Sequence, residues 1–277
     1  MTEMILTMAI PLLLTGILSG FLAGLLGVGG GVVIVPILSY YLEATGLNTS
    51  FAMHIAIATS LAIIVPTSIL SARTHIKLGN VDMAVIRSLG LMIFIGALGG
   101  GLLAQQLDNA GLKTVFGLLL AGIALLFLIR VVVLQEGLPG QPIRAVIGWL
   151  IGLVSALVGI GGGSLSVPTL TAFGWPIHRA VGSAALLGLI ISVPGMLSFI
   201  TVGWGMEGRP DWSLGYVWLP AALLISATAF FMAPIGARTA SKLDKTRLRR
   251  IFGLFLAVVS LRLIWSGLSA GAFGLGF

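Results

Sequence analysis

Long apolar runs, each bounded by short charged stretches, dominate the chain. A helix needs about 20 apolar residues to cross roughly 30 Å of hydrocarbon. Eight windows meet this requirement: 4–42, 52–72, 83–104, 112–134, 143–172, 180–203, 213–236 and 248–268. Most of the charged residues fall in the separators between these windows. The pattern predicts an all-α protein that crosses a membrane many times.

Two of these windows contain a triple glycine followed by a proline. The run GFLAGLLGVGGGVVIVP at residues 20–36 aligns without gaps to GLVSALVGIGGGSLSVP at residues 152–168. The alignment predicts one integral membrane domain built from two homologous repeats, residues 1–136 and 142–277. Paired glycine and proline interruptions in corresponding segments of two halves indicate the binding site of a secondary transporter.

The distribution of Lys and Arg favours inverted repeats. If each broken segment crosses the membrane once, six basic residues fall on one side and eight on the other, which is no bias. If the chain turns back at each triple glycine, twelve fall on one side, and only Lys113 and Arg209 fall on the other. Arg262 lies within a predicted segment and is left out of both counts. Cytoplasmic loops are enriched in Lys and Arg. We therefore predict inverted repeats with both termini outside.

The triple glycines are the candidate substrate site. Non-helical backbone at membrane depth is tolerated only where protein or a water-filled cavity satisfies its polar groups. Glycine permits positive φ, consecutive backbone N–H groups bind anions, and a helix that starts there adds its positive dipole end. The predicted substrate-binding residues are these glycines and nearby hydroxyl residues: Gly29, Gly30, Gly31, Gly161, Gly162, Gly163, Ser164, Ser166, Thr59, Ser60 and Ser183.

Simple helix packing is the alternative role for each of these groups. Gly16, Gly20 and Gly24 form a GxxxGxxxG series, and for these three we predict close packing of helices. Three adjacent glycines cannot share one helical stripe, so packing explains the triple glycines less well. Each hydroxyl can equally bond back to its own helix or across to another helix.

Composition excludes several other classes of protein. Of 277 residues, 58% are hydrophobic and 8% are charged, so there are too few charged side chains to coat a water-soluble surface. Cysteine is absent, and we predict no catalytic residues, no metal site and no cofactor. The net charge of +7 is explained by basic loops, so no nucleic-acid partner is expected. The apolar N-terminus lacks the basic flank of a signal peptide and is expected to be a retained membrane segment.

These motifs resemble those of the sulfite exporter TauE/SafE family of membrane proteins. The resemblance rests on the two glycine motifs with Pro36 and Pro168, and on three shorter stretches: Ala58–Ser60, Gly79–Asp82 and Ala180–Ala184. It implies export of sulfite or of small organosulfur anions such as sulfoacetate. One departure is that Ser183-Ala184 stands where the family often has Thr-Ser, which leaves the second hydroxyl pair incomplete.

The leading hypothesis is a secondary transporter for small sulfur-containing oxyanions in the cytoplasmic membrane. An intramembrane enzyme and a structural membrane protein are the alternatives. Its expected partners are a small anion and the lipid bilayer, and a homodimer is left open. No Asp or Glu falls in the middle of a predicted span, and His54 is the titrating group nearest to one. We therefore expect no carboxylate relay for protons.

Overall fold

The protein is described here by a computed structural model that covers residues 2–26, 29–47, 50–129, 134–240 and 245–273. Gly27 and Val28 of the first glycine motif lie outside the described residues, as do Arg130, Lys242 and Asp244. Helices make up most of the described chain. The fold class predicted from the sequence, an all-α polytopic protein, is therefore confirmed.

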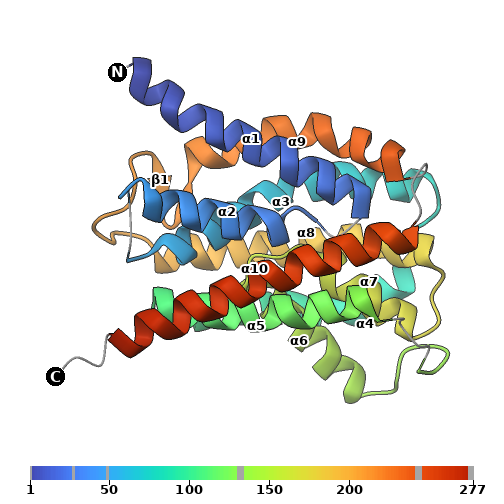
Figure 1. The fold of residues 1–277 in the computed structure, drawn as a ribbon. Helices are drawn as coiled ribbons and strands as arrows, with labels where there is room; N and C mark the ends of the chain where they lie inside the picture. Colours follow the sequence, from blue (N-terminus) through green and yellow to red (C-terminus); the bar gives the residue numbers. More distant parts are fainter. Residues whose placement is uncertain (1, 27–28, 48–49, 130–133, 241–244, 274–277) are drawn as a thin grey trace.

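Within the described residues, each half of the sequence contributes five helices (Figure 1). The first half contains α1 (Thr2–Leu26), α2 (Gly31–Ala44), α3 (Ala52–Lys77), α4 (Met83–Ala104) and α5 (Asn109–Leu128). The second half contains α6 (Ile143–Leu157), α7 (Gly162–Ala172), α8 (Ile177–Val202), α9 (Leu219–Ala240) and α10 (Lys245–Phe273).

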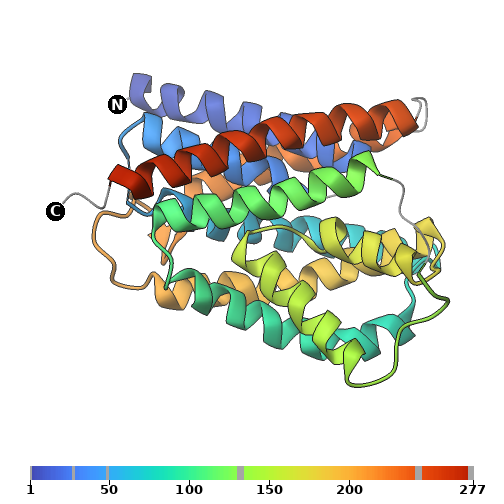
Figure 2. The same ribbon diagram turned by 60° about the horizontal axis from the view of Figure 1, so that its bottom comes forward.

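Each window that contains a triple glycine is split into two helices. Figure 1 shows α2 turning back beside α1, and Figure 2 shows α7 turning back after α6. With 15 and 11 residues, α6 and α7 are about 22 and 16 Å long, which is too short to cross the hydrocarbon. The second pair is therefore a hairpin of two short helices, neither of which spans the hydrocarbon by itself.

The helix contacts match when the two halves are exchanged. α1 packs along α9, and its counterpart α6 packs along α4, which is the counterpart of α9. α3 packs on α8, and α5 lies beside α10, where the two run in opposite directions (Figure 2). The two halves are thus interlocked around α3 and α8.

Small residues allow the α1–α9 and α4–α6 contacts. A Cβ placed on Gly20 would lie 2.5 Å from the Cα of Ala229, and Gly16 and Gly24 meet the backbone of α9 in the same way. The predicted packing role of these three glycines is confirmed. In the other pair, a Cβ on Gly100 would collide with the carbonyl oxygen of Leu153.

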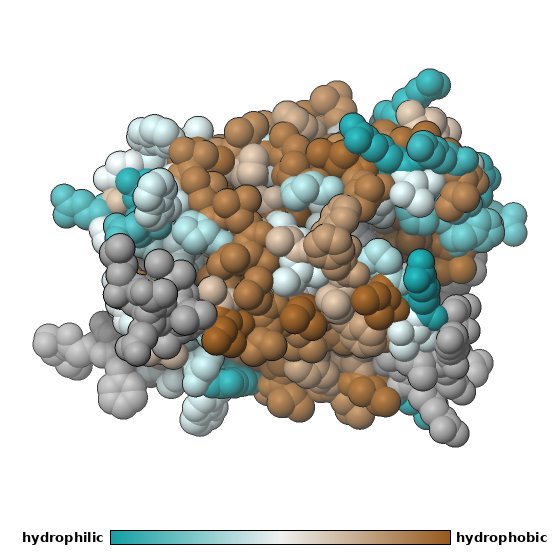
Figure 3. All heavy atoms as spheres, turned by 90° about the horizontal axis from the view of Figure 1, so that it is seen from above, coloured by the Kyte–Doolittle hydropathy of each residue, from teal (hydrophilic) through white to brown (hydrophobic). Residues whose placement is uncertain are grey.

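On the face seen in Figure 3, apolar residues cover the middle of the molecule and hydrophilic residues gather toward its two ends. Among the described helices, six are long and apolar enough to cross a membrane. The protein is a multi-pass membrane protein. We call the end that holds the α3–α4 loop (78–82) the basic end, and the end that holds the α4–α5 loop (105–108) the opposite end.

The segment between α8 and α9 was not predicted correctly. The sequence pattern predicts one span over 213–236, but the structure places a short antiparallel hairpin there, β1 (Ser213–Leu214) paired with β2 (Val217–Trp218), and α9 begins after it. Trp218 is 1% exposed, and its backbone N–H donates to the Thr59 hydroxyl over 3.0 Å. The hairpin is therefore part of the core at the opposite end.

Candidate functional site

The two glycine breaks meet inside the molecule. A Cβ placed on Gly29 would lie 3.6 Å from the Cα of Gly161, although the two residues are far apart in sequence. α2 begins at Gly31 and α7 begins at Gly162, so two helix N-termini start beside this contact. The first N–H groups of a helix have no partner within it. The breaks therefore bring two sets of backbone donors to one place.

Positive φ angles turn the chain at one glycine of each break. Gly29 has a φ of 75° in the first break, and Gly159 has a φ of 66° in the second. Gly162 is required for a different reason, because a Cβ there would lie 2.5 Å from the carbonyl oxygen of Ala184 and 2.6 Å from the amide nitrogen of Gly188. The positive φ expected of the triple glycine thus falls outside it in the second break.

A cavity of about 490 Å³ lies against the two breaks. Gly29, Gly30 and Gly161–Gly163 contribute to its lining, which then follows α3 from Ile63 to His75 in the last turn of that helix. The cavity therefore extends from the breaks toward the basic end. No Lys, Arg, Asp or Glu of the described chain lines it. Any charge attraction in this cavity must come from backbone dipoles and from His75.

A stripe of polar side chains on α3 faces this cavity and was missed from the sequence. Thr67, Ser68, Ser71, Thr74 and His75 all line it. Thr67 and Thr74 donate back to carbonyls of α3, while the Ser68 and Ser71 hydroxyls have no hydrogen-bond partner within the described part of the chain. The spacing of three to four residues was the available signal, because such positions share one helix face.

Three of the predicted hydroxyl residues serve other contacts. Thr59 accepts from the backbone of Trp218, and Ser60 donates to the carbonyl oxygen of Gly159 over 2.8 Å. Ser183 accepts from the backbone N–H of Asp82 over 2.9 Å. None of the three lines the cavity. Ser60 nevertheless holds the second break in place from α3.

The remaining predicted residues lie in the walls behind the cavity. Gly31 is buried against the carbonyl oxygen of Gly159, which leaves no room for a side chain. Ser164 and Ser166 are 3% and 0% exposed on α7 and do not line the cavity. The structure thus brings five of the predicted glycines to the cavity and keeps the predicted hydroxyl residues away from it.

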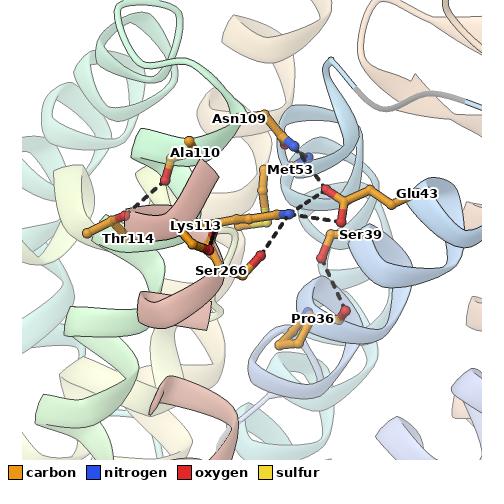
Figure 4. A network of polar contacts seen from close by, with 10 residues as sticks. Pro36, Ser39, Glu43, Met53, Asn109, Ala110, Lys113, Thr114 and Ser266 are labelled. Carbon is orange, nitrogen blue, oxygen red and sulfur yellow. Dashed lines mark hydrogen bonds and ion pairs between the residues drawn. The ribbon is translucent and has the colours of Figure 1, made fainter. Parts of the chain in front are cut away.

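A polar network fixes the far end of α2 (Figure 4). The Lys113 ammonium lies 2.7 Å from one oxygen of Glu43 and donates to the other over 2.8 Å. Glu43 also accepts from the side chain of Asn109, and Lys113 donates to Ser266 on α10. The helix whose start forms the first break is therefore tied to α5 and α10 at its other end.

A second network fixes the chain beyond the end of α7. The Trp175 indole donates to Asp82 over 3.1 Å, and the guanidinium of Arg179 lies 3.8 Å from the same oxygen. The other Asp82 oxygen caps α4 by accepting from the N–H of Ala84. Burial would raise the pKa of Asp82, but these hydrogen bonds and Arg179 outweigh it and hold the pKa below its usual value. Both half-helices are thus anchored through a carboxylate.

The lowered pKa of Asp82 predicts a pH-dependent stability difference. Its carboxylate stabilises the fold above the unfolded pKa, near 3.9, and this contribution is lost as the pH falls through the lower folded value. We expect Asp82→Asn, which can still cap α4, to be less stable than wild type at pH 7 by up to about 1 kcal/mol. Thermal unfolding in detergent should show the gap narrowing as the pH falls below the unfolded pKa of the carboxyl group. A gap that keeps its size on acidification would contradict the prediction.

Metal chemistry is not suggested by the side chains of this region. Among the described residues, no three His, Asp or Glu side chains come close enough together to hold a metal ion. The cavity offers backbone N–H groups and hydroxyls, which suit an oxyanion.

The fold and its cavity define a multi-pass membrane transport protein. The chain belongs to the sulfite exporter TauE/SafE family, whose match spans residues 12–263. A "probable membrane transporter protein" of Haemophilus influenzae is 42% identical over 91% of this chain and 96% of its own length. A probable membrane transporter protein of Methanocaldococcus jannaschii is 27% identical over 90% of this chain and 93% of its own length. YfcA of Escherichia coli, which has the same description, is 26% identical over 93% of this chain and 92% of its own length. These names indicate a transporter and not an enzyme. No solved structure matches the chain.

Proposed function

We propose that this protein is a secondary transporter that binds a small sulfur-containing oxyanion where the two glycine breaks meet. The observation that carries the proposal is the approach of Gly29 to Gly161 beside a cavity of about 490 Å³. Two helix N-termini start at that point, and each favours negative charge through its dipole and its free N–H groups. The Ser68 and Ser71 hydroxyls add further donors along the cavity wall.

The absence of Lys and Arg from the described lining suits transport. An anion held by N–H dipoles and hydroxyls is bound without a full opposite charge, so less free energy is needed for its release. The substrate class comes from the family, whose description names sulfite. Export is favoured by the inside-negative potential, by about 2.3 kcal/mol per charge per 100 mV.

Purified protein in liposomes gives the direct test of this function. Efflux of sulfite, thiosulfate, sulfoacetate and sulfate is measured side by side, with protein-free liposomes as the control. We expect saturable efflux of at least one sulfur oxyanion, and competition from the others should rank the substrates. Efflux no faster than from empty liposomes for all four anions would reject the proposal.

We also propose that the two repeats are inverted and that the basic end faces the cytoplasm. Two features support this orientation: the exchange of helix contacts between the halves, and the hairpins that α1 with α2 and α6 with α7 form (Figures 1 and 2). In this orientation Arg73, Lys77 and Arg179 lie on the cytoplasmic side, as the positive-inside rule requires.

Cysteine labelling tests this orientation, because the chain has no cysteine of its own. Four exposed positions are replaced singly: Lys77, Gln106, His178 and Asp211. We expect cysteines at 106 and 211 to react with an impermeant thiol reagent from outside intact cells, and those at 77 and 178 to react only after the cells are opened. If each broken segment crossed once, positions 77 and 178 would instead label from opposite sides.

A further inference from the structure

A second pocket lies at the opposite end, away from the glycine breaks. It measures about 500 Å³ and is lined by the start of α3, the α4–α5 loop and the segment around Tyr216. Phe51, His54, Gln106, Asp108 and Tyr216 are among its lining residues. We call it the His54 pocket. It shares no residue with the cavity at the breaks, so the proposed anion site does not explain it.

His54 is buried in the wall of this pocket and has one unsatisfied ring nitrogen. The side chain is 3% exposed, and its ring packs against Tyr216 and Phe51, with centroid distances of 5.2 and 5.8 Å. Nε2 lies 3.1 Å from the carbonyl oxygen of Ala104, while Nδ1 is buried with no hydrogen-bond partner in the described chain. Leaving a buried polar atom without a partner is unfavourable, so this nitrogen is a candidate for binding a ligand.

The hydrogen bond to Ala104 decides what Nδ1 can bind. A carbonyl oxygen only accepts, so Nε2 must carry the hydrogen, and in the neutral ring Nδ1 is then a bare acceptor. An acceptor cannot bind an ionised oxyanion, which has no hydrogen to donate. The partner of Nδ1 must therefore bring a hydrogen, and the simplest such ligand is a proton taken from water in the pocket.

The charged groups around the pocket are compatible with a protonated His54. Asp108 supplies a carboxylate to the pocket lining, and one of its oxygens caps α5 through Gly111. Lys113 is engaged by Glu43, and Arg209 donates to the carbonyl oxygen of Met206. Tyr216 is the other titratable group of the lining. A positive imidazole would thus face a carboxylate across the pocket.

We propose that His54 is the proton-binding site of this transporter and that it couples anion flux to the pH at the opposite end. The coupling rests on the proposed anion transport, while the proton site rests on the pocket alone. α3 connects the two sites, since His54 lies in its first turn and Ile63, Ser68 and His75 line the anion cavity. The site is an imidazole, so it needs no carboxylate relay within the membrane.

Flux through proteoliposomes tests the coupling. The transported anion is a sulfonate that stays ionised over the whole pH range of the assay, so the substrate itself carries no proton across the membrane. The wild-type rate should change with the pH at the opposite end by roughly tenfold over two pH units around the pKa of His54. His54→Gln, whose amide can still donate to Ala104, should transport at a rate independent of that pH. The matched control His178→Gln, at an exposed position, should keep the wild-type response.

Two results would overturn the coupling. One is a wild-type transport rate that is independent of pH, and the other is a His54→Gln variant that keeps the wild-type pH response. In both cases anion transport itself stands. No anion flux in any protein would instead reject the proposed function, and the proton site is then judged by nitrogen NMR alone.

Nitrogen NMR of the ¹⁵N-histidine-labelled protein tests the proton site without any transport. The chain has three histidines, so the signal that disappears in His54→Gln is assigned directly. We expect that signal to show a neutral ring with hydrogen on Nε2 at high pH and a doubly protonated ring at low pH. A ring that stays neutral down to the lowest pH at which the protein remains folded would mean that the pocket holds a water molecule only, and the proposal would fail.

Discussion

Gly161→Leu is expected to stop anion flux while leaving the protein folded. Gly161 has φ −70° and ψ 166°, a conformation open to any residue, and a Cβ there would lie 3.6 Å from a methyl carbon of Ile64, an ordinary contact. The added side chain would occupy the cavity beside the two helix N-termini. We expect flux to fall at least about tenfold, which requires only about 1.4 kcal/mol of added barrier.

Two matched variants separate blockage of the cavity from loss of packing. Gly161→Ala adds only a Cβ in ordinary van der Waals contact with Ile64 and should keep most of the flux. Gly162→Ala places its Cβ 2.5 Å from the Ala184 carbonyl oxygen, so it should destabilise the protein by about 1–3 kcal/mol through overpacking of α7 on α8. Flux assays in liposomes and thermal unfolding in detergent measure the two effects. Normal flux in Gly161→Leu would remove the breaks from the transport path.

Gly30→Leu extends the same test to the first repeat. Gly30 is in a helical conformation, and the nearest atom to a Cβ there is the flexible Cδ1 of Ile34, at 3.0 Å. The leucine should therefore fit with a small shift of Ile34 and fill the cavity from the other side. Loss of flux in both leucine variants, with both proteins still folded, would assign the site to the two breaks together.

The breaks were predictable from sequence because they depend on local chemistry. A triple glycine and a proline inside an apolar run disfavour a continuous membrane helix, and the same motif occurs in both halves of the sequence. The GxxxGxxxG contact of α1 was predictable for the same reason, since spacing alone defines the stripe. Which helix it meets was not predictable, because Ile225 and Ala229 lie in the other half of the chain.

The hydroxyl contacts depended on partners that the sequence does not reveal. The Thr59 hydroxyl accepts a hydrogen bond from the backbone of Trp218, at the end of a hairpin that the sequence pattern assigns to an apolar span. The Ser183 hydroxyl accepts one from the backbone of Asp82 in the α3–α4 loop. By contrast, Ser68 and Ser71 lie on one face of α3 and were detectable by helical spacing, but a polar stripe on a membrane helix gains meaning only beside a cavity.

The anchored ends of the two half-helices suggest how the breaks are held in position. α2 and α7 are too short to be fixed by a full crossing of the membrane, so their far ends need other restraints. Glu43 with Lys113 provides one restraint, and Trp175 with Asp82 provides the other. In each case the restraint lies at the end of the half-helix away from its glycine break. The glycines can therefore keep an irregular backbone while the helices that follow them remain fixed.

Lys113→Met is expected to be among the most destabilising single substitutions in the protein. The side chains of Lys113 and Glu43 are 10% and 26% exposed, so removing one partner leaves the other charge largely buried and uncompensated. Breaking such a pair costs about 3–5 kcal/mol when it is fully buried, and we expect about 3 kcal/mol because Glu43 keeps some contact with water. Unfolding in detergent measures this loss.

The double variant Glu43→Gln with Lys113→Met distinguishes a charge effect from loss of packing. It removes both charges, and the amide can still accept from Asn109, so the double variant should be more stable than Lys113→Met alone. Ser266→Ala, which removes only the hydrogen bond of 3.3 Å to Lys113, should cost about 1 kcal/mol or less. If the two single losses simply added in the double variant, the pair would not hold α2, and packing alone would anchor the helix that begins at the first break.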